Sequence, residues 1–302
     1  MAPPLFLLAP PRSYTSVICA MLGQHPQMFG LPELNLFNVK TLKELWREVS
    51  EEIAPDITRR QGLLRAIAEI YGGEQTQATI VMAIHWVAAR QDMDTGEVYK
   101  ELVERMDPLI LVEKSPAYTI HQERMERIFQ TFPEARFIHL TRHPITQGRS
   151  VMNLNEGIFA FFVESFDLEG ECAILDPQYA WYQIHMNILN FLEKVPKEQY
   201  IRMKGEDIME NPEERLREIC EWLGVRTDDE AISRMMRPQE SPFACFGPLT
   251  AMFGNDPNFL RRPTFRRHKP KLPPLDSPLP WRNDGARLKK EIIELAREFG
   301  YK

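Results

Sequence analysis

Two stretches of this chain carry residues suited to binding an anion. In the first, Arg12-Ser13-Tyr14-Thr15-Ser16, three hydroxyl side chains and a tyrosine follow a guanidinium group. A helix that starts at about Thr15 directs its unpaired N-terminal amides toward one point, and such a helix end attracts negative charge. Arginine adds a fixed charge and a planar set of donors that suit phosphate or sulfonate oxygens. The alternative is that Ser13 or Thr15 only caps the helix and that Arg12 is a solvated surface charge.

The second group follows the ends of two later strands. Arg142 comes directly after the strand expected at residues 136–140, and Ser150 lies about two helical turns further on, so both can face one bound group. Glu113-Lys114-Ser115-Pro116 follows the strand expected at residues 109–112. Ligands of open α/β sheets bind at the carboxyl ends of the strands. The alternative is that Arg142 is a strand-end charge and Ser150 a polar position on a helix.

The elements that must position these groups are short apolar strands and amphipathic helices. The run Leu5–Ala9, ended by Pro10-Pro11, is typical of a strand at the centre of a parallel sheet. A strand is also expected at the start of residues 200–208. Helical spacing and end signals predict helices at residues 15–23, 41–53, 58–71, 75–89, 94–106, 120–129, 176–192 and 286–299. The helices between residues 40 and 106 form an insertion that we expect to cover the mouth of the sheet.

Composition narrows the class of protein. The chain has 302 residues, of which 43% are hydrophobic and 26% charged, which is typical of a globular protein with one large or two small domains. The net charge of −6 argues against a general nucleic-acid binder. The four cysteines have no metal or redox spacing, which favours a reduced, cytoplasmic setting. No run reaches membrane-spanning length, and we expect no signal peptide.

Together, the motifs resemble those of the sulfotransferase family. The turn at Arg12 is similar to the family's 5′-phosphosulfate loop, commonly Pro-Arg-Ser-Gly-Thr-Thr, and Tyr14 stands where Gly is usual. We call residues 12–16 the donor loop. Arg142-His143-Pro144, with Ser150 eight positions after Arg142, resembles the Arg-Asp-Pro and Ser pair that binds the 3′-phosphate of the sulfate donor.

Two further blocks carry the same resemblance. Residues 113–118 look like the family's Glu-Lys-Ser/Thr-Pro element, and residues 200–224 look like its Tyr-Glu-Asp-Leu and Phe-Leu-Gly block. Gly205 stands where Tyr is frequent, so an adenine contact from that side chain is lost. Glu206 and Asp207 are interpreted as structural residues that fasten the strand to the next helix.

The resemblance implies one α/β domain over residues 1–302, with a central, mainly parallel sheet flanked by helices. It implies 3′-phosphoadenosine-5′-phosphosulfate as the sulfate donor and no metal. Arg12 and Lys114 would hold the phosphosulfate and its bridging oxygen. A basic, proline-rich loop at residues 241–280 would fold over the 3′-phosphate. The residues implied for donor binding are Arg12, Ser13, Tyr14, Thr15, Ser16, Arg142, Ser150, Arg266 and Arg267.

Glu33 is the candidate general base. It stands at the same distance from the loop arginine as the catalytic glutamate of protein-tyrosine sulfotransferases, and a helix followed by a return turn can bring it to the acceptor side. The alternatives are a surface glutamate or a salt-bridge partner of a pocket arginine. His268 and His143 are the next candidates for the base.

The acceptor is expected to carry a hydroxyl on a small molecule or a carrier-bound acyl chain. Residues 253–259 with Trp281 resemble sulfotransferases of cyanobacterial polyketide pathways, in which a β-hydroxyacyl chain is sulfated. The main rival function is a nucleotide-binding regulatory protein without turnover. A metal-dependent kinase would need a loop lysine and a strand-end aspartate, and neither is present in the right place.

Overall fold

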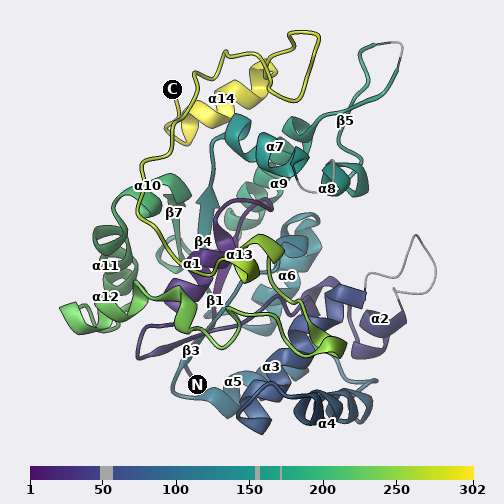
Figure 1. Cartoon of the computed structure of the whole chain (residues 1–302), viewed down its shortest axis with the longest axis vertical. Helices are drawn as coiled ribbons and strands as arrows, with labels where there is room; N and C mark the ends of the chain where they lie inside the picture. The colour runs from purple at the N-terminus through teal and green to yellow at the C-terminus, as the bar shows by residue number, and fades with distance from the viewer. Residues whose placement is uncertain (48–56, 154–156, 171) are drawn as a thin grey trace.

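A parallel sheet of five strands forms the centre of the computed structural model, which describes residues 1–47, 57–153, 157–170 and 172–302 (Figure 1). Every pairing in the sheet is parallel, which confirms the predicted mainly parallel sheet. In spatial order the strands are β2 (Met28–Gly30), β3 (Ile110–Glu113), β1 (Leu5–Leu8), β4 (Arg136–Thr141) and β7 (Tyr200–Lys204).

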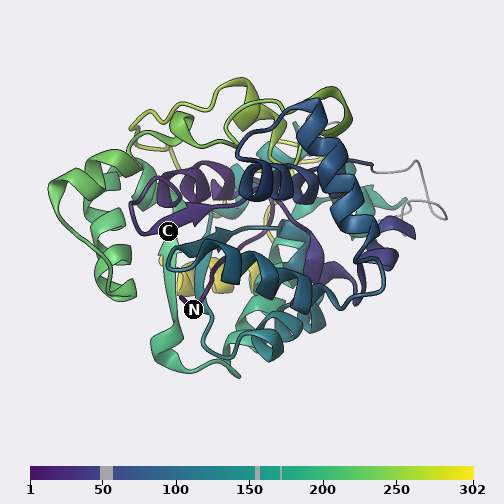
Figure 2. The same cartoon turned by 90° about the horizontal axis from the view of Figure 1, so that it is seen from below.

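Both faces of the sheet are covered by helices because side chains alternate along each strand. On β1, Leu5 and Leu7 face one hydrophobic cluster, whereas Phe6 and Leu8 face the other. The helices of the first cluster include α1 (Thr15–Leu22), α11 (Pro212–Leu223) and α12 (Asp229–Met235). Those of the second include α3 (Gln61–Gly72), α4 (Gln77–Ala88), α5 (Thr95–Met106), α6 (Gln122–Thr131) and α9 (Pro177–Leu192). Figure 2 shows helices on both sides of the strands.

A third apolar cluster joins the last part of the chain to this core. It packs α14 (Lys290–Glu298) against α9 and α7 (Pro144–Met152). The remaining elements are shorter: α2 (Leu42–Arg47), α8 (Ile158–Phe162), α10 (Gly205–Glu210), α13 (Pro257–Arg261), and the antiparallel strands β5 (Phe166–Asp167) and β6 (Ile174–Leu175).

The predicted helices occur with small shifts of their ends, and the helix predicted at residues 41–53 lies outside the described residues from position 48 onward. Strand β2, helix α12 and the β5–β6 pair were not predicted. Within the helical insertion, α5 packs on the face of the sheet beside β3, while the start of α3 lies beside Glu33 at the carboxyl edge.

In the part of the chain that the structure describes, no helix combines the length and the apolar character needed to cross a lipid bilayer.

Candidate active site

The predicted site residues meet at the carboxyl edge of the sheet. The donor loop follows β1, Lys114 follows β3, and Arg142 follows β4. Because β1 lies between β3 and β4, its loop opens at the crevice where ligands of open α/β sheets bind. Glu33 follows the edge strand β2, which pairs with β3. Strand order therefore gathers residues that are far apart in the sequence.

The donor loop presents an open helix end. Tyr14 is the N-cap of α1 and makes no side-chain cap, so the first amides of the helix keep their capacity to bind an anion. The Ser13 side chain is fully buried, and no hydrogen-bond partner for its Oγ is found in the described part of the chain. An orphaned hydroxyl beside open amides suits a ligand rich in acceptor oxygens. Arg12 and Tyr14 adopt left-handed backbone conformations, with φ of 66° and 63°.

Arg12 has two side-chain partners from distant parts of the chain. Its Nε donates to Ser150 Oγ at 3.2 Å, and its NH1 pairs with the Asp256 carboxylate. Arg142 lies beside it, with its guanidinium 4.4 Å from the centroid of the Tyr14 ring and hydrogen-bonded to the Arg12 carbonyl oxygen. The arginine and the serine that were predicted to share one bound group are therefore linked through Arg12.

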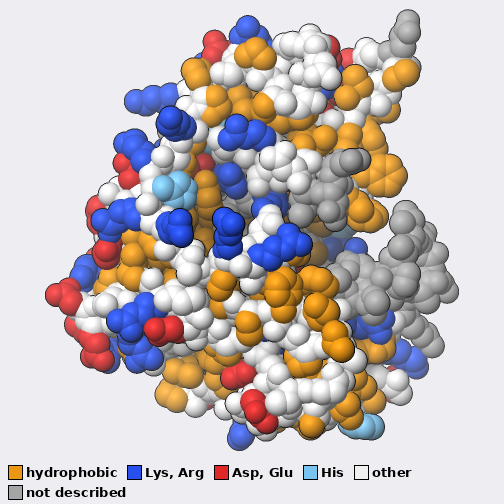
Figure 3. Space-filling model, viewed as in Figure 1, with side chains coloured by type: hydrophobic (Ala, Val, Ile, Leu, Met, Phe, Trp, Pro, Cys, Tyr) orange, Lys and Arg blue, Asp and Glu red, His pale blue; other side chains and the backbone are white. Residues whose placement is uncertain are grey.

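A cavity of about 840 Å³, here called the main cavity, opens beside these residues. It is lined by the start of α1, by Arg142 and by residues between 256 and 268. Its size is in the range of small-ligand pockets. Figure 3, in the same view as Figure 1, shows Lys and Arg side chains in a band across the middle of the molecule, over α13 and the segment that follows it. The cavity is thus positively charged on more than one side.

The basic loop contributes unevenly to the main cavity. Arg261, Arg262 and Arg266 line it. The donor-capping role of this segment stays a prediction. Arg267 does not line the cavity, because its guanidinium pairs with Glu213 on α11. Its role in binding the sulfate donor stays a prediction.

The two histidines considered as bases lie in different surroundings. His268 lines the main cavity, and its Nδ1 lies 3.0 Å from the carbonyl oxygen of Arg266. His143 is buried against the Tyr301 ring and does not line the cavity. Burial lowers the pKa of His143 to about 4, so its imidazole is neutral near pH 7.

Glu33 forms an ion pair with Lys114, and the two residues follow the neighbouring strands β2 and β3. The Lys114 side chain is 1% exposed and the Glu33 side chain 27% exposed, so the carboxylate is the accessible partner. The sequence placed Glu33 by a helix and a return turn, but strand β2 makes the return. Gly62 at the start of α3 secures the position, since a Cβ there would lie 2.0 Å from the Glu33 carbonyl oxygen.

Glu113 is buried beneath the Glu33–Lys114 pair and holds the neighbouring backbone in place. This role was not predicted from the sequence. The fully buried Oε1 of Glu113 accepts hydrogen bonds from Leu34 N, Ser115 Oγ and Tyr118 OH. These bonds hold the residue next to Glu33 against the strand end that carries Lys114. Burial raises the pKa of the Glu113 carboxyl to about 7, although the three hydrogen bonds oppose the rise.

We expect Glu113→Gln to change how stability depends on pH. A carboxyl pKa raised from 4.5 to about 7 means that the folded protein binds more protons than the unfolded chain in this range. The contribution of Glu113 to the free energy of unfolding therefore falls as the pH rises through this window. Glutamine does not titrate, so denaturant unfolding at pH 5 and pH 8 should favour the variant more at the higher pH. An equal difference at both values would contradict the raised pKa.

One residue that was predicted to be structural, Glu206, and one that was missed, Asp256, have clear contacts. Glu206 accepts hydrogen bonds from His143 N and from the Tyr301 hydroxyl, so it joins α10 to the end of β4 and to the last residues of the chain. The predicted link was a different one, from the preceding strand to the next helix. Asp256 was not singled out, although it lies in the quoted block of residues 253–259. The turn Asn255-Asp256-Pro257 and the cap that Asp256 forms on α13 could have drawn attention to it.

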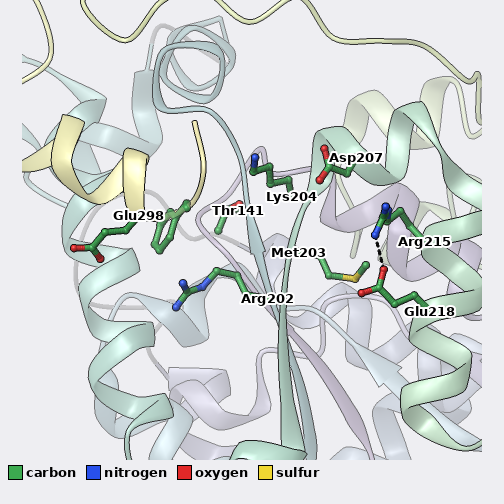
Figure 4. A pocket seen from close by; sticks show the side chains of 9 residues that line it. Thr141, Arg202, Met203, Lys204, Asp207, Arg215, Glu218 and Glu298 are labelled. Atoms are coloured by element: carbon green, nitrogen blue, oxygen red, sulfur yellow. Dashed lines mark hydrogen bonds and ion pairs between the residues drawn. The ribbon is translucent and has the colours of Figure 1, made fainter. Parts of the chain in front are cut away.

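A second pocket, of about 190 Å³, lies at the outer edge of β7 (Figure 4). Acidic and basic side chains of β7, α10, α11 and α14 line it, and Arg215 pairs there with Glu218. None of the residues predicted for catalysis or donor binding lines this pocket. The main cavity is lined by six of the predicted residues, Arg12, Tyr14, Thr15, Ser16, Arg142 and Arg266, whereas Ser13, Glu33, Lys114 and Ser150 do not line it. It is therefore the candidate site for the donor.

Known proteins provide an independent comparison. A model of the sulfotransferase family matches residues 3–229. The sulfotransferase domain from the curacin biosynthetic pathway is similar in structure, with a TM-score of 0.77, 24% identity and coverage of 100% of this chain and 99% of that one. The sulfotransferase domain from the Synechococcus PCC 7002 olefin synthase gives a TM-score of 0.71 and 25% identity, with coverage of 99% and 95%.

A curated relative, mouse heparan sulfate glucosamine 3-O-sulfotransferase 6, is 23% identical over 138 residues, which is 42% of this chain. The match spans 39% of the length of that relative. The family match is broader, because it covers well over half of the chain and includes the donor loop, Lys114, Arg142 and Ser150. The chain belongs to the sulfotransferase family.

Proposed function

We propose that this protein transfers the sulfuryl group of 3′-phosphoadenosine-5′-phosphosulfate to a hydroxyl group on an apolar or acyl-chain acceptor. The observation that carries the proposal is the meeting of an open helix end, Arg12 and Arg142 at one cavity. Ser150 is bonded to Arg12 behind the lining of that cavity, and the Glu33–Lys114 pair lies beside β3. Family membership favours this donor.

The donor's two anionic ends have separate partners in this proposal. The amides of α1 with Arg12 and the Ser13 hydroxyl bind the 5′-phosphosulfate end, because these groups converge at the start of the helix. Arg142 and Ser150 bind the 3′-phosphate, and Arg266 approaches it from the basic loop. The bond between Arg12 and Ser150 joins the two subsites.

The chemistry is a displacement at sulfur. The acceptor oxygen forms a bond to sulfur, the bond from sulfur to the bridging oxygen breaks, and the acceptor proton passes to Glu33. Negative charge that develops on the bridging oxygen is stabilised by Lys114, Arg12 and the helix amides. The ion pair with Lys114 holds the Glu33 carboxylate at the end of β3, where it can meet the acceptor hydroxyl.

An apolar acceptor is supported by the surface beside Glu33. The Glu33 amide donates to the Gly254 carbonyl oxygen, and the neighbouring Phe253 packs against Phe246 with ring centroids 5.9 Å apart. Phe246 is partly exposed and Leu249 almost fully exposed. The likeness to a domain of an olefin synthase also favours an acyl chain. A hydroxyl on such a chain, free or bound to a carrier protein, is the acceptor that we propose.

The proposed 3′-phosphate subsite predicts a binding defect in Arg142→Ala. Removal of a charge-assisted contact worth roughly 1.5 to 3 kcal/mol should weaken binding of adenosine 3′,5′-bisphosphate about tenfold or more. Calorimetric titration measures this change directly, and Ser150→Ala should show a smaller loss in the same assay. An unchanged dissociation constant in Arg142→Ala would remove the 3′-phosphate subsite from the proposal.

Asp256 predicts a change in the opposite direction. Its carboxylate forms an ion pair with the Arg12 guanidinium, so an incoming phosphate must compete with Asp256 for that group. We expect Asp256→Asn to tighten binding of adenosine 3′,5′-bisphosphate roughly twofold to tenfold, because the competing interaction is worth about 0.5 to 1.5 kcal/mol. Asparagine can still cap α13, which makes the substitution a test of charge alone. Weaker binding in the same titration would show instead that Asp256 orients Arg12 for the ligand.

Turnover distinguishes this function from its rivals. The protein is incubated with 3′-phosphoadenosine-5′-phosphosulfate and a panel of 3-hydroxyacyl thioesters, long-chain alcohols, sugars and tyrosine peptides, and products are read by mass spectrometry. Sulfation of the acyl or alcohol acceptors should persist in EDTA, because Arg12, Lys114 and the helix amides carry the charge stabilisation. Sulfation restricted to sugars or peptides would exclude the proposed acceptor class. Transfer from ATP that requires Mg²⁺ would identify a kinase.

A further inference from the structure

Tyr14 holds a position that a glycine would occupy with less strain. Its φ of 63° lies in the left-handed region, where a Cβ atom is crowded by the following carbonyl group. Residues other than glycine persist in this region when the surrounding structure requires the side chain. The Tyr14 side chain therefore has contacts that maintain the conformation.

The Tyr14 ring lies between the end of β4 and the start of α10. On one side, the centroid of the ring is 4.4 Å from the guanidinium carbon of Arg142. On the other, a Cβ on Gly205 would lie only 2.6 Å from Tyr14 Cδ2. Position 205 must therefore lack a side chain for as long as the ring is in place. The ring also lines the main cavity, so it is not simply part of the core.

Arg142 is held from several sides in this arrangement. Its guanidinium donates to the Arg12 carbonyl oxygen and to Thr146 Oγ1, and the Tyr14 ring covers one of its faces. A cation over an aromatic ring is attracted by the ring's negative face, more so when water is partly excluded. An arginine that is already fixed loses less side-chain entropy when it binds an anion.

We infer that Tyr14 is a positioning residue for Arg142 and that Tyr14 and Gly205 form one coupled pair. The inference rests on the proposed function, in which Arg142 binds the 3′-phosphate of the donor. The two departures from the family pattern, tyrosine at position 14 and glycine at position 205, are in contact in the structure. A Cβ at position 205 would begin in the space that the Tyr14 ring fills, so a ring carried by α10 could enter that space only if residue 14 lacked one.

Two variants distinguish the effect of the aromatic face of Tyr14 on ligand binding from the effect of its volume. Tyr14→Phe keeps the ring, whereas Tyr14→Leu keeps much of the apolar bulk but has no π-face. Calorimetry compares adenosine 3′,5′-bisphosphate with adenosine 5′-monophosphate, which lacks the 3′-phosphate. We expect Tyr14→Phe to bind both ligands within about twofold of the unmodified protein, and Tyr14→Leu to lose roughly threefold to tenfold for the bisphosphate only.

The coupling between positions 14 and 205 is tested by transferring the aromatic ring from one position to the other. Gly205→Tyr alone should bind the bisphosphate poorly because its side chain collides with Tyr14, and Tyr14→Gly alone should bind poorly because Arg142 loses its support. The double variant Tyr14→Gly/Gly205→Tyr should recover affinity to within a fewfold of the unmodified protein, so that the two effects are strongly non-additive. Thermal unfolding of each variant shows whether it is folded, and the Phe and Leu variants test the inference even where Gly205→Tyr does not fold.

Three results would overturn the inference. They are equal bisphosphate affinity in Tyr14→Leu and the unmodified protein, an equal loss for both ligands in Tyr14→Leu, and additive losses in a folded double variant. Failure of the proposed function is distinguishable from these, because the unmodified protein would then show no preference for the bisphosphate over the monophosphate.

Discussion

Glu33→Gln is expected to lower kcat by roughly 10²- to 10⁴-fold while the affinity for adenosine 3′,5′-bisphosphate stays within about twofold. Glutamine preserves the shape of the side chain but cannot accept the proton of the acceptor hydroxyl. Donor binding should be spared because the donor loop and Arg142 are unchanged. Steady-state kinetics with an acceptor from the turnover panel, combined with calorimetry, measures both quantities on the same variant.

Glu101→Gln is a matched control for this experiment. Glu101 lies on α5, is paired with Arg90, and has a side chain about as exposed as that of Glu33. The control should retain normal kcat and donor affinity. A Glu33→Gln protein with near-normal kcat would eliminate Glu33 as the base, and His268, which lines the main cavity, would become the next residue to substitute.

Lys114→Met should lower kcat by roughly 10²- to 10³-fold, the usual cost of removing one group that stabilises developing negative charge. The methionine side chain fits a position that is only 1% exposed, and Glu33 remains hydrated because its side chain is 27% exposed. We therefore expect the loss to occur in the chemical step rather than in folding. Single-turnover kinetics and a thermal melt separate the two.

The surface substitution Lys43→Met controls for the general effect of replacing a lysine, since Lys43 pairs with Asp92 on an exposed part of the chain. The double variant Glu33→Gln/Lys114→Met tests whether the ion pair acts as a unit. Its kcat should be little lower than that of the worse single variant, because the two residues serve the same step. Near-normal kcat in Lys114→Met would contradict the proposed stabilisation of the bridging oxygen.

The parts of the fold that were predictable from the sequence carry strong local signals. Strands β1 and β3 carry continuous apolar runs, and β4 has apolar residues at Phe137, Ile138 and Leu140. The ends of the three strands are marked by proline or by charged residues. Helix α9 has a long amphipathic pattern and an aspartate cap. Strand β2 was missed because it has three residues, Met28–Gly30, and owes its conformation to pairing with β3 rather than to its own composition.

The candidate site also has residues that could be predicted from the sequence and contacts that could not. Arg12, Lys114 and Arg142 were predicted because each follows a strand whose end could be read locally. The partners that set their geometry could not be read, since they are far away in the sequence: Asp256 meets Arg12 across 244 positions, and Glu113 meets Leu34 across 79. The contact between Tyr14 and Gly205 is equally invisible in a linear pattern. These pairings arise when the sheet is assembled.

The affinity of the unmodified protein for adenosine 3′,5′-bisphosphate, compared with adenosine 5′-monophosphate and with Mg²⁺-ATP, tests the central claim most directly. The three ligands share the adenosine group and differ in where their phosphates lie. The arrangement of Arg12, Arg142 and Ser150 predicts that the bisphosphate binds at least tenfold more tightly than the monophosphate, since one charge-assisted subsite is worth roughly 1.5 to 3 kcal/mol. Equal affinities for the two, or a clear preference for Mg²⁺-ATP, would contradict the assignment of this site to a phosphoadenosine phosphosulfate donor.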